Sequence, residues 1–200
     1  MKKLFLLLFV SIFMVSVASS ASALVIFEDN FDTENGGVGV LNYIGFANWD
    51  VTDGTVDLIG NGYFDFQPGY GLYVDMDGST GNAGMMTSGI YLAAGAYTLQ
   101  FDLAGNHRNN AGEQVDVSVA MGPIFSKSYS LNQDDPFQTF TETIDVAADG
   151  DYFLQFEGVG GDNIGMLLDN VKIASVPEPA TMLLFGIGFL GLAIGRKKLF

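Results

Sequence analysis

Residues 96–105 read AYTLQFDLAG, and apolar side chains occupy every second position through the middle of this run. In an extended chain Tyr97, Leu99 and Phe101 point to one side, while Thr98 points to the other. A period of two is typical of a β-strand with one face in a hydrophobic core and the other in solvent. The run therefore predicts a half-buried strand.

The same alternation recurs in other runs separated by Gly, Asn and Asp: ALVIFEDNF, GTVDLIG, GYFDF, YGLYVDM, MTSGIYL, QVDVSVAM, FQTFTETIDV, DYFLQFEGV and GMLLDNVKI. No convincing amphipathic helix interrupts them. Eight to ten strands at this spacing predict an all-β protein, an antiparallel two-sheet sandwich for which a jelly roll is the most economical arrangement. The length of about 150 residues suits one domain, expected over residues 24–175.

The first 23 residues have the features of a secretory signal peptide. Lys2 and Lys3 precede a long apolar run, and the segment closes on Ala21-Ser22-Ala23. Small residues at Ala21 and Ala23 fit the pocket of signal peptidase, so cleavage is expected after Ala23. The alternative is an uncleaved N-terminal anchor. Either interpretation places the following domain outside the cytoplasm.

The expected domain is strongly acidic. Between Leu24 and Ser175, 22 acidic residues stand against three basic ones. Such a surface repels phosphate backbones, which excludes nucleic acid as a partner, and it favours cations such as calcium. The chain has no cysteine, so disulfides and thiolate chemistry are excluded.

Residues 176–200 form a segment of different character. The triplet Pro177-Glu178-Pro179 is followed by uncharged residues 180–195 and then by Arg196, Lys197 and Lys198. An apolar span of this kind predicts a transmembrane helix over residues 180–195, somewhat shorter than the roughly 20 residues of a full span. The three basic residues would remain cytoplasmic and stop the chain in the membrane. The two prolines keep the triplet extended and accessible to a processing enzyme.

These three parts, in this order, closely resemble the PEP-CTERM sorting signal of exported bacterial proteins. The resemblance implies anchoring in the inner membrane, processing near the triplet by an exosortase-like enzyme, and transfer to the cell surface or extracellular space. It also implies an exopolysaccharide and biofilm context. The alternative is an ordinary membrane anchor preceded by a chance Pro-x-Pro.

Catalytic signatures are scarce. His107 is the single histidine and is expected to be solvent-exposed in a polar loop segment, and no Gly-x-Ser-x-Gly motif occurs. A histidine-based metal site would need more imidazoles. The sequence therefore predicts a non-catalytic domain with no catalytic residues. A carboxylate-dependent glycoside hydrolase stays open, because the acidic residues are many and their separations are not defined by sequence.

The segments FEDNFD, FANWDV and LLDNVKI loosely resemble those of galactose-binding-like jelly rolls, which include many carbohydrate-binding modules. That resemblance implies a structural calcium ion held by Asp32 and Asp169, with Glu28 in reserve. Alternatively, Asp169 caps its strand or bonds to a neighbouring loop.

A second acidic segment, VDMDGSTGNAG, places Asp75, Asp77 and Ser79 at alternate positions. Its glycine falls two positions too early for an EF-hand and no glutamate closes the loop, so a tight turn is the preferred interpretation.

Three functions fit these features. The preferred one is a structural or adhesive surface protein in an exopolysaccharide matrix. The alternatives are a carbohydrate-binding module and the glycoside hydrolase above. Saccharide binding needs exposed aromatic rings, and the candidates are Tyr63, Phe64, Phe66, Tyr70 and Tyr73. Trp49 is expected in the core instead.

Overall fold

A computed structural model describes residues 22–108 and 114–177, without the side chains of 114–119. Most of the predicted signal peptide lies outside this part, as do the predicted transmembrane helix, Glu178, Pro179 and the basic cluster at 196–198. Those predictions are therefore untested by the structure. Within the described ranges, no helix has the length and hydrophobicity needed to cross a membrane.

The regular secondary structure of the described chain consists of antiparallel β-strands and one short 3-10 helix. The elements are β1 (Val25–Asp29), η1 (Glu34–Gly37), β2 (Asp50–Thr52), β3 (Asp57–Gly60), β4 (Leu72–Asp75), β5 (Met85–Leu92), β6 (Gly95–Ala104), β7 (Gln114–Met121), β8 (Phe125–Asn132), β9 (Gln138–Val146), β10 (Gly150–Val159) and β11 (Leu167–Ser175).

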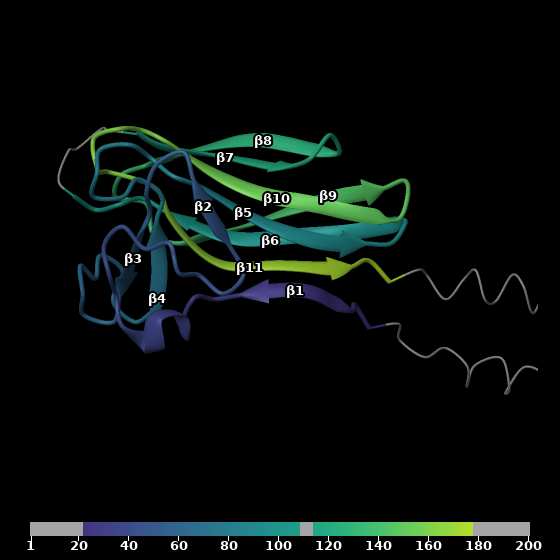
Figure 1. Ribbon diagram of the computed structural model, residues 1–200, viewed down its shortest axis with the longest axis horizontal. Helices are drawn as coiled ribbons and strands as arrows, with labels where there is room; N and C mark the ends of the chain where they lie inside the picture. Colours follow the sequence, from purple (N-terminus) through teal and green to yellow (C-terminus); the bar gives the residue numbers. More distant parts are fainter. Residues whose placement is uncertain (1–21, 109–113, 178–200) are drawn as a thin grey trace, which may run out of the picture. The chain divides into compact units, whose positions relative to one another are not determined.

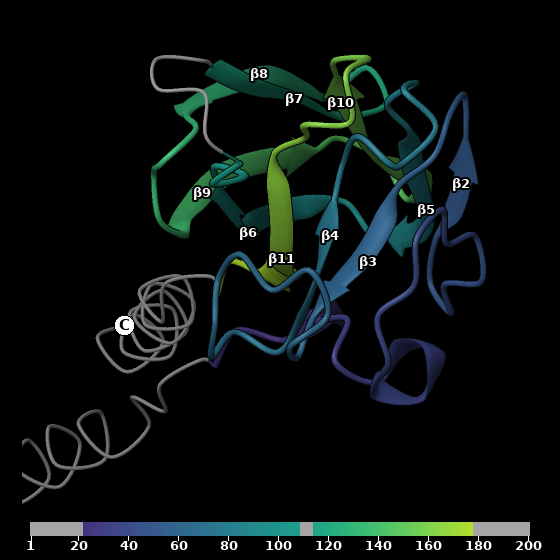
Figure 2. The same ribbon diagram turned by 90° about the vertical axis from the view of Figure 1, so that its left-hand side faces the viewer.

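The strands form two facing sheets (Figures 1 and 2). One sheet has the order β3-β4-β11-β6-β9, with β1 also paired to β11, and the other has the order β2-β5-β10-β7-β8. Strands β4 to β11 alone give four-stranded orders β4-β11-β6-β9 and β5-β10-β7-β8, which is jelly-roll topology. The predicted all-β sandwich is confirmed, and β1, β2 and β3 extend the jelly roll at its margins.

The opening run explains the centre of the first sheet. Its apolar residues Tyr97, Leu99, Phe101 and Leu103 are buried. On the two sides of β6, Leu99 pairs with Ile173 of β11 and with Glu142 of β9. A strand hydrogen-bonded on both edges and buried on one face has a fixed register, because a shift of one residue would expose every apolar side chain.

The core lies between the sheets. Phe101 of the first sheet meets Phe156 of the second edge to face, with ring centroids 5.2 Å apart, and Trp49 meets the same Phe156 at 5.7 Å. Both phenylalanines are fully buried, and each such ring contributes about 2–3 kcal/mol through burial. Trp49 is a core residue, as predicted.

The structure differs from the predicted strands in three places: one predicted strand is a loop, and two observed strands were not predicted. Segment 62–66 forms a loop, because Gly62 and Phe64 both adopt left-handed backbone conformations. The additional strands are β2 and β8. Strand β8 reads FSKSYSLN, and Ser and Lys weaken its alternation, but Tyr129 and Leu131 still point into the core.

Strand β8 is also tied to the opposite sheet. Lys127 Nζ and Tyr129 Oη both donate to Glu142 Oε1 on β9, at 2.6 and 2.8 Å. These contacts close one side of the sandwich between β8 and β9. They also lower the pKa of Glu142, through the Lys127 hydrogen bond first.

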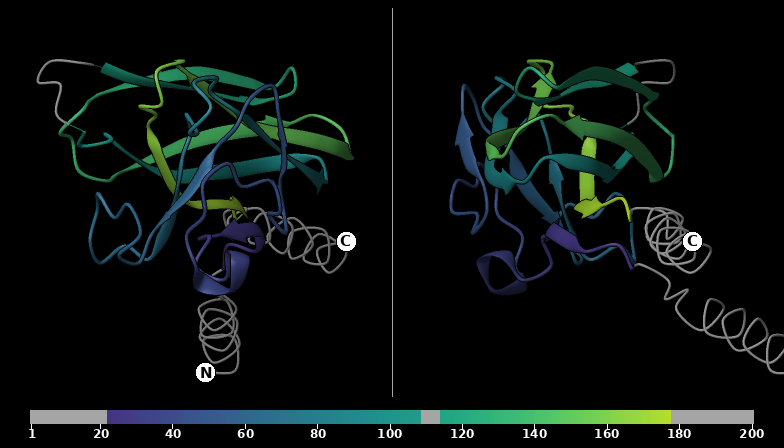
Figure 3. Two further views of the ribbon diagram at one scale, coloured as in Figure 1. Left: turned by 60° about the vertical axis from the view of Figure 1, so that its left-hand side comes forward. Right: turned by 90° about the vertical axis from the view of Figure 1, so that its right-hand side faces the viewer.

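The two ends of the sandwich chain are neighbours. Strand β1 pairs antiparallel with β11, and Val25 lies opposite Ala174 (Figure 3). Residues Val25–Ser175 form one compact unit that contains the buried core residues of the described chain.

Candidate functional site

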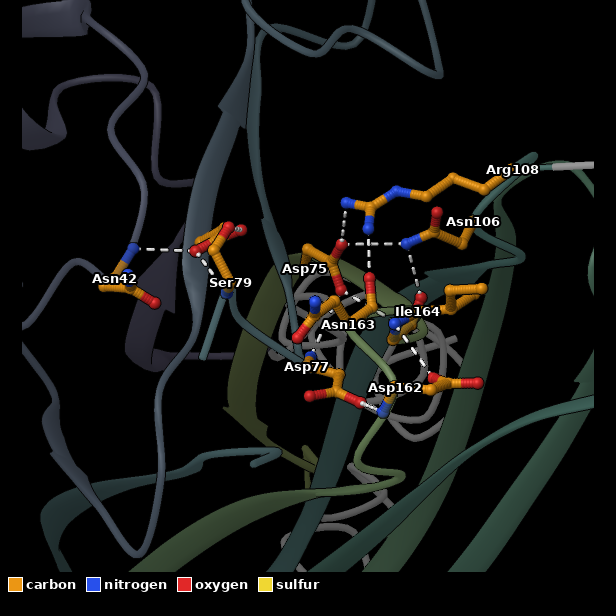
Figure 4. Close-up of polar contacts among 11 residues, drawn as sticks. Asn42, Asp75, Asp77, Ser79, Asn106, Arg108, Asp162, Asn163 and Ile164 are labelled. Carbon is orange, nitrogen blue, oxygen red and sulfur yellow. Dashed lines mark hydrogen bonds and ion pairs between the residues drawn. The ribbon is translucent and has the colours of Figure 1, made fainter. Parts of the chain in front are cut away.

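A hydrogen-bonded network links the end of β4 to the loops after β6 and before β11 (Figure 4). At its centre is Asp75, a fully buried carboxylate. Its Oδ2 accepts from Arg108 Nη2 and from Asn106 Nδ2, both at 2.8 Å, while its Oδ1 accepts from the backbone N–H of Asp77 and Gly165. These four hydrogen bonds therefore use the full acceptor capacity of the carboxylate and hold the loops in position.

Burial raises the pKa of Asp75 to about 7, although the neighbouring Arg108 charge acts in the opposite direction. The Arg108 guanidinium is held on a second side, because Nη1 donates to the Asn163 carbonyl. It also lies over the Phe66 ring, 5.0 Å from the centroid. With 25% of its side chain exposed, Arg108 is fixed in place and still reaches the surface.

The loop between β10 and β11 is organised by Asp77. Its Oδ2 accepts from the backbone N–H of Gly161 at 2.7 Å and of Asp162 at 3.1 Å. This loop carries Asn163, whose Oδ1 has no hydrogen-bond partner although that atom is buried.

Arg108 and Asn163 line an open groove of about 530 Å³. The lining residues are Leu41, Asp57, Phe64, Phe66, Ser79, His107, Arg108 and Asn163. Phe64 is 51% exposed, so its ring offers an apolar surface to solvent. We call this the Arg108 groove.

The Arg108 groove contains a serine, a histidine and an aspartate, but they are not arranged as a catalytic triad. Ser79 Oγ donates to Asp57 Oδ2 at 2.7 Å, and His107 Nε2 lies 2.6 Å from Gln67 Nε2. A triad needs the histidine between the nucleophile and the acid. Here the serine is bonded to the acid directly. His107 is half-buried, whereas the sequence had indicated a solvent-exposed loop histidine.

The predicted aromatic candidates divide into two groups. Tyr63, Phe64 and Tyr70 are exposed, while Phe66 is half-buried beneath Arg108. Tyr73 is fully buried, and its hydroxyl donates to Asp65 Oδ1 at 3.1 Å, so it is a structural residue.

The segment around Asp75, Asp77 and Ser79 makes loop and turn hydrogen bonds, which fit the predicted turn, although Asp77 Oδ1 is buried without a hydrogen-bond partner. In residues 22–108 and 114–177, no three His, Asp or Glu side chains gather into a group that could hold a metal ion.

The other acidic site, at Asp32 and Asp169, lies where β11 is irregular. Asn170 has a left-handed φ of 50°, and the pairing with β6 shifts register between Asp169 and Lys172. Asp169 is 1% exposed and accepts from Asn170 through the backbone N–H at 2.7 Å and Nδ2 at 3.2 Å. Asp169 thus bonds to the next residue of its own strand, whereas the predicted alternative was a strand cap or a bond to a neighbouring loop.

The charge of Asp32, the other residue of the predicted calcium pair, acts on Asp169. Burial above all, together with the charges of Asp102, Asp32 and Asp29, raises its pKa to about 8, against the effect of the Asn170 backbone hydrogen bond. Asp102 Oδ1 is buried without a hydrogen-bond partner. Carboxylate oxygens are the ligands that calcium prefers, so the chemistry of this donor set fits the ion. Remaining ligands would have to come from backbone or amide oxygens, because three acidic side chains do not converge. Glu28, the reserve residue, is paired with Lys172 instead.

The C-terminal segment of the chain matches a known protein-sorting motif. Residues 175–198 match the PEP-CTERM protein-sorting motif, in agreement with the resemblance of residues 176–200. The chain carries this sorting motif, which implies an exported protein. A search of curated proteins found no match.

Solved structures similar to this chain have low sequence identity. One is the CBM22-1 xylan-binding domain of Xyn10C from Paenibacillus barcinonensis, with 11% identity, a TM-score of 0.49, and coverage of 80% of this chain and 99% of that one. Another is the K3 cleaved adhesin domain of Lys-gingipain from Porphyromonas gingivalis, with 15% identity, a TM-score of 0.48, and coverage of 78% and 100%. A third is the carbohydrate-binding module CBM6cm-2 of lichenase 5A from Cellvibrio mixtus, in complex with cellotriose, with 12% identity, a TM-score of 0.41, and coverage of 76% and 99%.

Sequence reasoning identified Phe64 and Phe66 as candidates but missed Arg108 and Asn163. Arg108 is one of only three basic residues between Leu24 and Ser175, and this rarity is the signal that could have singled it out. Its partner Asp75 lies 33 residues away in the sequence, so nothing local joins the two.

Proposed function

We propose that this chain is an exported, non-catalytic adhesive protein of the bacterial cell surface or extracellular matrix. Its tail would anchor it in the inner membrane until an exosortase-like enzyme acts near Pro177-Glu178-Pro179. The matched sorting motif supports this route. The expected destination is an exopolysaccharide or biofilm context.

We further propose that the domain adheres by binding saccharide in the Arg108 groove. The observation that carries this function is a fixed guanidinium beside an exposed Phe64 ring in an open groove. Sugars present apolar C–H faces and polar hydroxyls together, so a ring beside fixed donors and acceptors suits them. Arg108, whose side chain is 25% exposed, supplies N–H donors to a hydroxyl or carboxylate.

The carboxylates in this region favour binding over hydrolysis. A glycoside hydrolase needs an acid and a base on opposite sides of a cleft. Asp57 is buried and accepts from Ser79 and from the Asn42 backbone N–H, while Asp75 is buried under Arg108. Neither of these two carboxylates faces the groove free of internal partners.

Binding is tested on a glycan array with neutral and uronate-containing oligosaccharides, comparing the wild-type protein with Phe64→Ala. The variant should lose binding without losing stability, because Phe64 is a surface residue. Ile44→Ala is the matched control, since Ile44 is also exposed and does not line the groove. Binding of the uronate-containing probes that survives Phe64→Ala would remove the Arg108 groove as the site.

The sorting route has a separate test. Mass spectrometry of surface-localised protein should show loss of residues 180–200 in a host with the exosortase and retention in a host without it. Retention in both hosts would identify a permanent membrane anchor instead.

A structural calcium ion at Asp32 and Asp169 is also proposed. It would neutralise a buried carboxyl group whose pKa is raised by burial and by the charges of Asp102, Asp32 and Asp29. An ion bound only by the folded state raises the unfolding temperature, so chelation should lower it. An unchanged transition with no calcium in elemental analysis would contradict the proposal.

A further inference from the structure

Strand β5 contains a glycine that its backbone does not require. Gly89 lies in the interior of an eight-residue strand, and the pairing with β10 runs without a register shift from Leu92 to Met85. Its φ is not positive, so the backbone conformation is open to any residue. Glycine inside a regular strand weakens the strand and often marks a place where a ligand approaches closely. The backbone conformation therefore does not explain why this position is glycine.

Gly89 lies on the outer face of the five-stranded sheet, beside two exposed aromatic residues. Tyr91 follows it on the same face of β5 and is 61% exposed, while Phe153 pairs directly with Gly89 from β10 and is 57% exposed. A Cβ atom added at Gly89 would lie 3.6 Å from Phe153 Cε1. On the other side, β7 ends at Met121 opposite Leu154, so β7 carries no residue opposite Phe153. The Phe153 ring is thus left open to solvent.

A groove of about 370 Å³ runs up to Gly89 from the sheet edge. Strand β2 begins at Asp50, which pairs with Thr87, so β5 has no strand partner on that side beyond this point. The polar residues Asn48, Asp50 and Thr87 line the groove together with the buried Ser88, and Trp49 is among the apolar residues that complete it. The Asn48 amide is held in place, because its Nδ2 donates to Asp29 Oδ2 at 3.0 Å.

The charge around this groove is negative. Asp50 lines it, and Asp151 pairs with Tyr91 on the same sheet face. The basic side chains of the described chain are paired elsewhere: Arg108 with Asp75, Lys127 with Glu142 and Lys172 with Glu28. An anionic ligand would be repelled, whereas a hydroxyl group can donate to the Asp50 carboxylate.

We propose that the groove at Gly89 is a second saccharide-binding site, specific for uncharged saccharides. The sugar ring packs its C–H face on Phe153 and its hydroxyls bond to Asp50, Asn48 and Thr87. Gly89 is glycine because a larger side chain would occupy the space of the ligand. The site shares no lining residue with the Arg108 groove, so it goes beyond the function proposed above and does not depend on it.

Two separate sites would let one molecule bind two polysaccharide chains. The two grooves would also bind ligands of different charge, because, of the two, only the Arg108 groove is lined by an Arg or Lys side chain. Such a protein would cross-link a matrix, which a single binding site cannot do without self-association.

The test uses the full-length chain in a detergent without a sugar head group, because a glycosidic detergent could compete. The probes are uncharged gluco-, xylo-, manno- and galacto-oligosaccharides, with uronate oligosaccharides as a separate arm. Gly89→Thr fills the groove at a strand position that favours β-branched residues. It should weaken binding of the uncharged probes by about tenfold or more and leave thermal unfolding unchanged.

Gly150→Thr is the matched control, because it adds the same side chain to the same strand pair where a Cβ meets only Tyr152, at 3.8 Å. Phe153→Ala is the second test variant and keeps the proposal falsifiable if Gly89→Thr unfolds. It changes an exposed residue and should weaken the same probes.

The outcomes separate the two grooves. Loss of uncharged-probe binding in Gly89→Thr and Phe153→Ala, with retention in Phe64→Ala, supports the second site. Loss in Phe64→Ala alone overturns it and leaves the Arg108 groove. Wild-type protein that binds none of the uncharged probes also overturns it, whatever happens in the uronate arm.

Discussion

Replacing Asp169 by asparagine tests the electrostatics of the β11 site most directly. Asp169 is almost fully buried, its hydrogen bonds come from Asn170 alone, and three other carboxylates act on it. Asparagine has nearly the same shape and no charge, so it mimics the protonated carboxyl group. The Asp169→Asn change therefore removes the ionisation and keeps the packing.

The effect on stability depends on pH in a defined direction. The pKa of Asp169 is raised from 3.8 to about 8 in the folded chain. Below about pH 4 the group is protonated in both states and has no effect. As the pH rises, the unfolded chain ionises and the folded one does not, so the free energy of unfolding falls by up to about 1.4 kcal/mol per pH unit. The loss levels off above pH 8, at no more than about 6 kcal/mol.

Asp169→Asn should therefore be close to neutral near pH 4 and increasingly stabilising up to about pH 8, by at least about 2 kcal/mol. Urea unfolding of residues 24–175, followed by circular dichroism in the presence of a chelator, measures this difference. A difference between variant and wild type that is the same at both ends of the pH range would refute the reasoning.

Added calcium reverses the expectation if the ion binds at this site. The wild-type protein should then gain stability, and its Asp169 carboxylate should stay ionised at neutral pH. Asp169→Asn should lose that gain, because it removes one ligand. Wild-type stability that does not respond to calcium would contradict the proposed ion and leave the pH prediction intact.

Three further predictions concern other contacts. Arg108→Met leaves the buried Asp75 carboxyl group without its cation, so the free energy of unfolding should fall by about 2–4 kcal/mol above pH 7. The loss should be smaller at pH 5, where the Asp75 carboxyl group is protonated. A thermal melt that matches Arg108→Lys at both pH values would contradict this prediction. Glu142→Gln should lower the free energy of unfolding by about 1 kcal/mol at neutral pH and by less on acidification. The reason is that a carboxyl group with a lowered pKa stabilises the fold only while it is ionised. Equal losses of stability at about pH 3 and pH 7 in urea unfolding would count against this prediction. Glu178→Ala should block processing without changing the melting temperature, as judged by mass spectrometry and circular dichroism, and normal processing would show that the triplet's charge is not read.

The sequence carried most of the fold because strand patterning is local. The alternation in residues 96–105 depends only on which side each residue faces, and β6 has the predicted buried positions, with half-buried residues between them. The pattern failed where local chemistry conflicts with it. Strand β8 has polar residues on its outer face and few strong strand formers, while the aromatic residues of 62–66 alternate in a loop whose left-handed positions forbid a strand.

The sequence by itself determined the class of fold and the PEP-CTERM signal, because alternating strands and an apolar tail with a basic end are properties of contiguous residues. The tertiary structure decided both grooves. Arg108 meets Asp75 across 33 residues, and Phe153 meets Gly89 only because β10 pairs with β5 in one register. Which strands become neighbours follows from packing two whole sheets on one core, and that choice is cooperative over the domain and leaves no mark on any short segment.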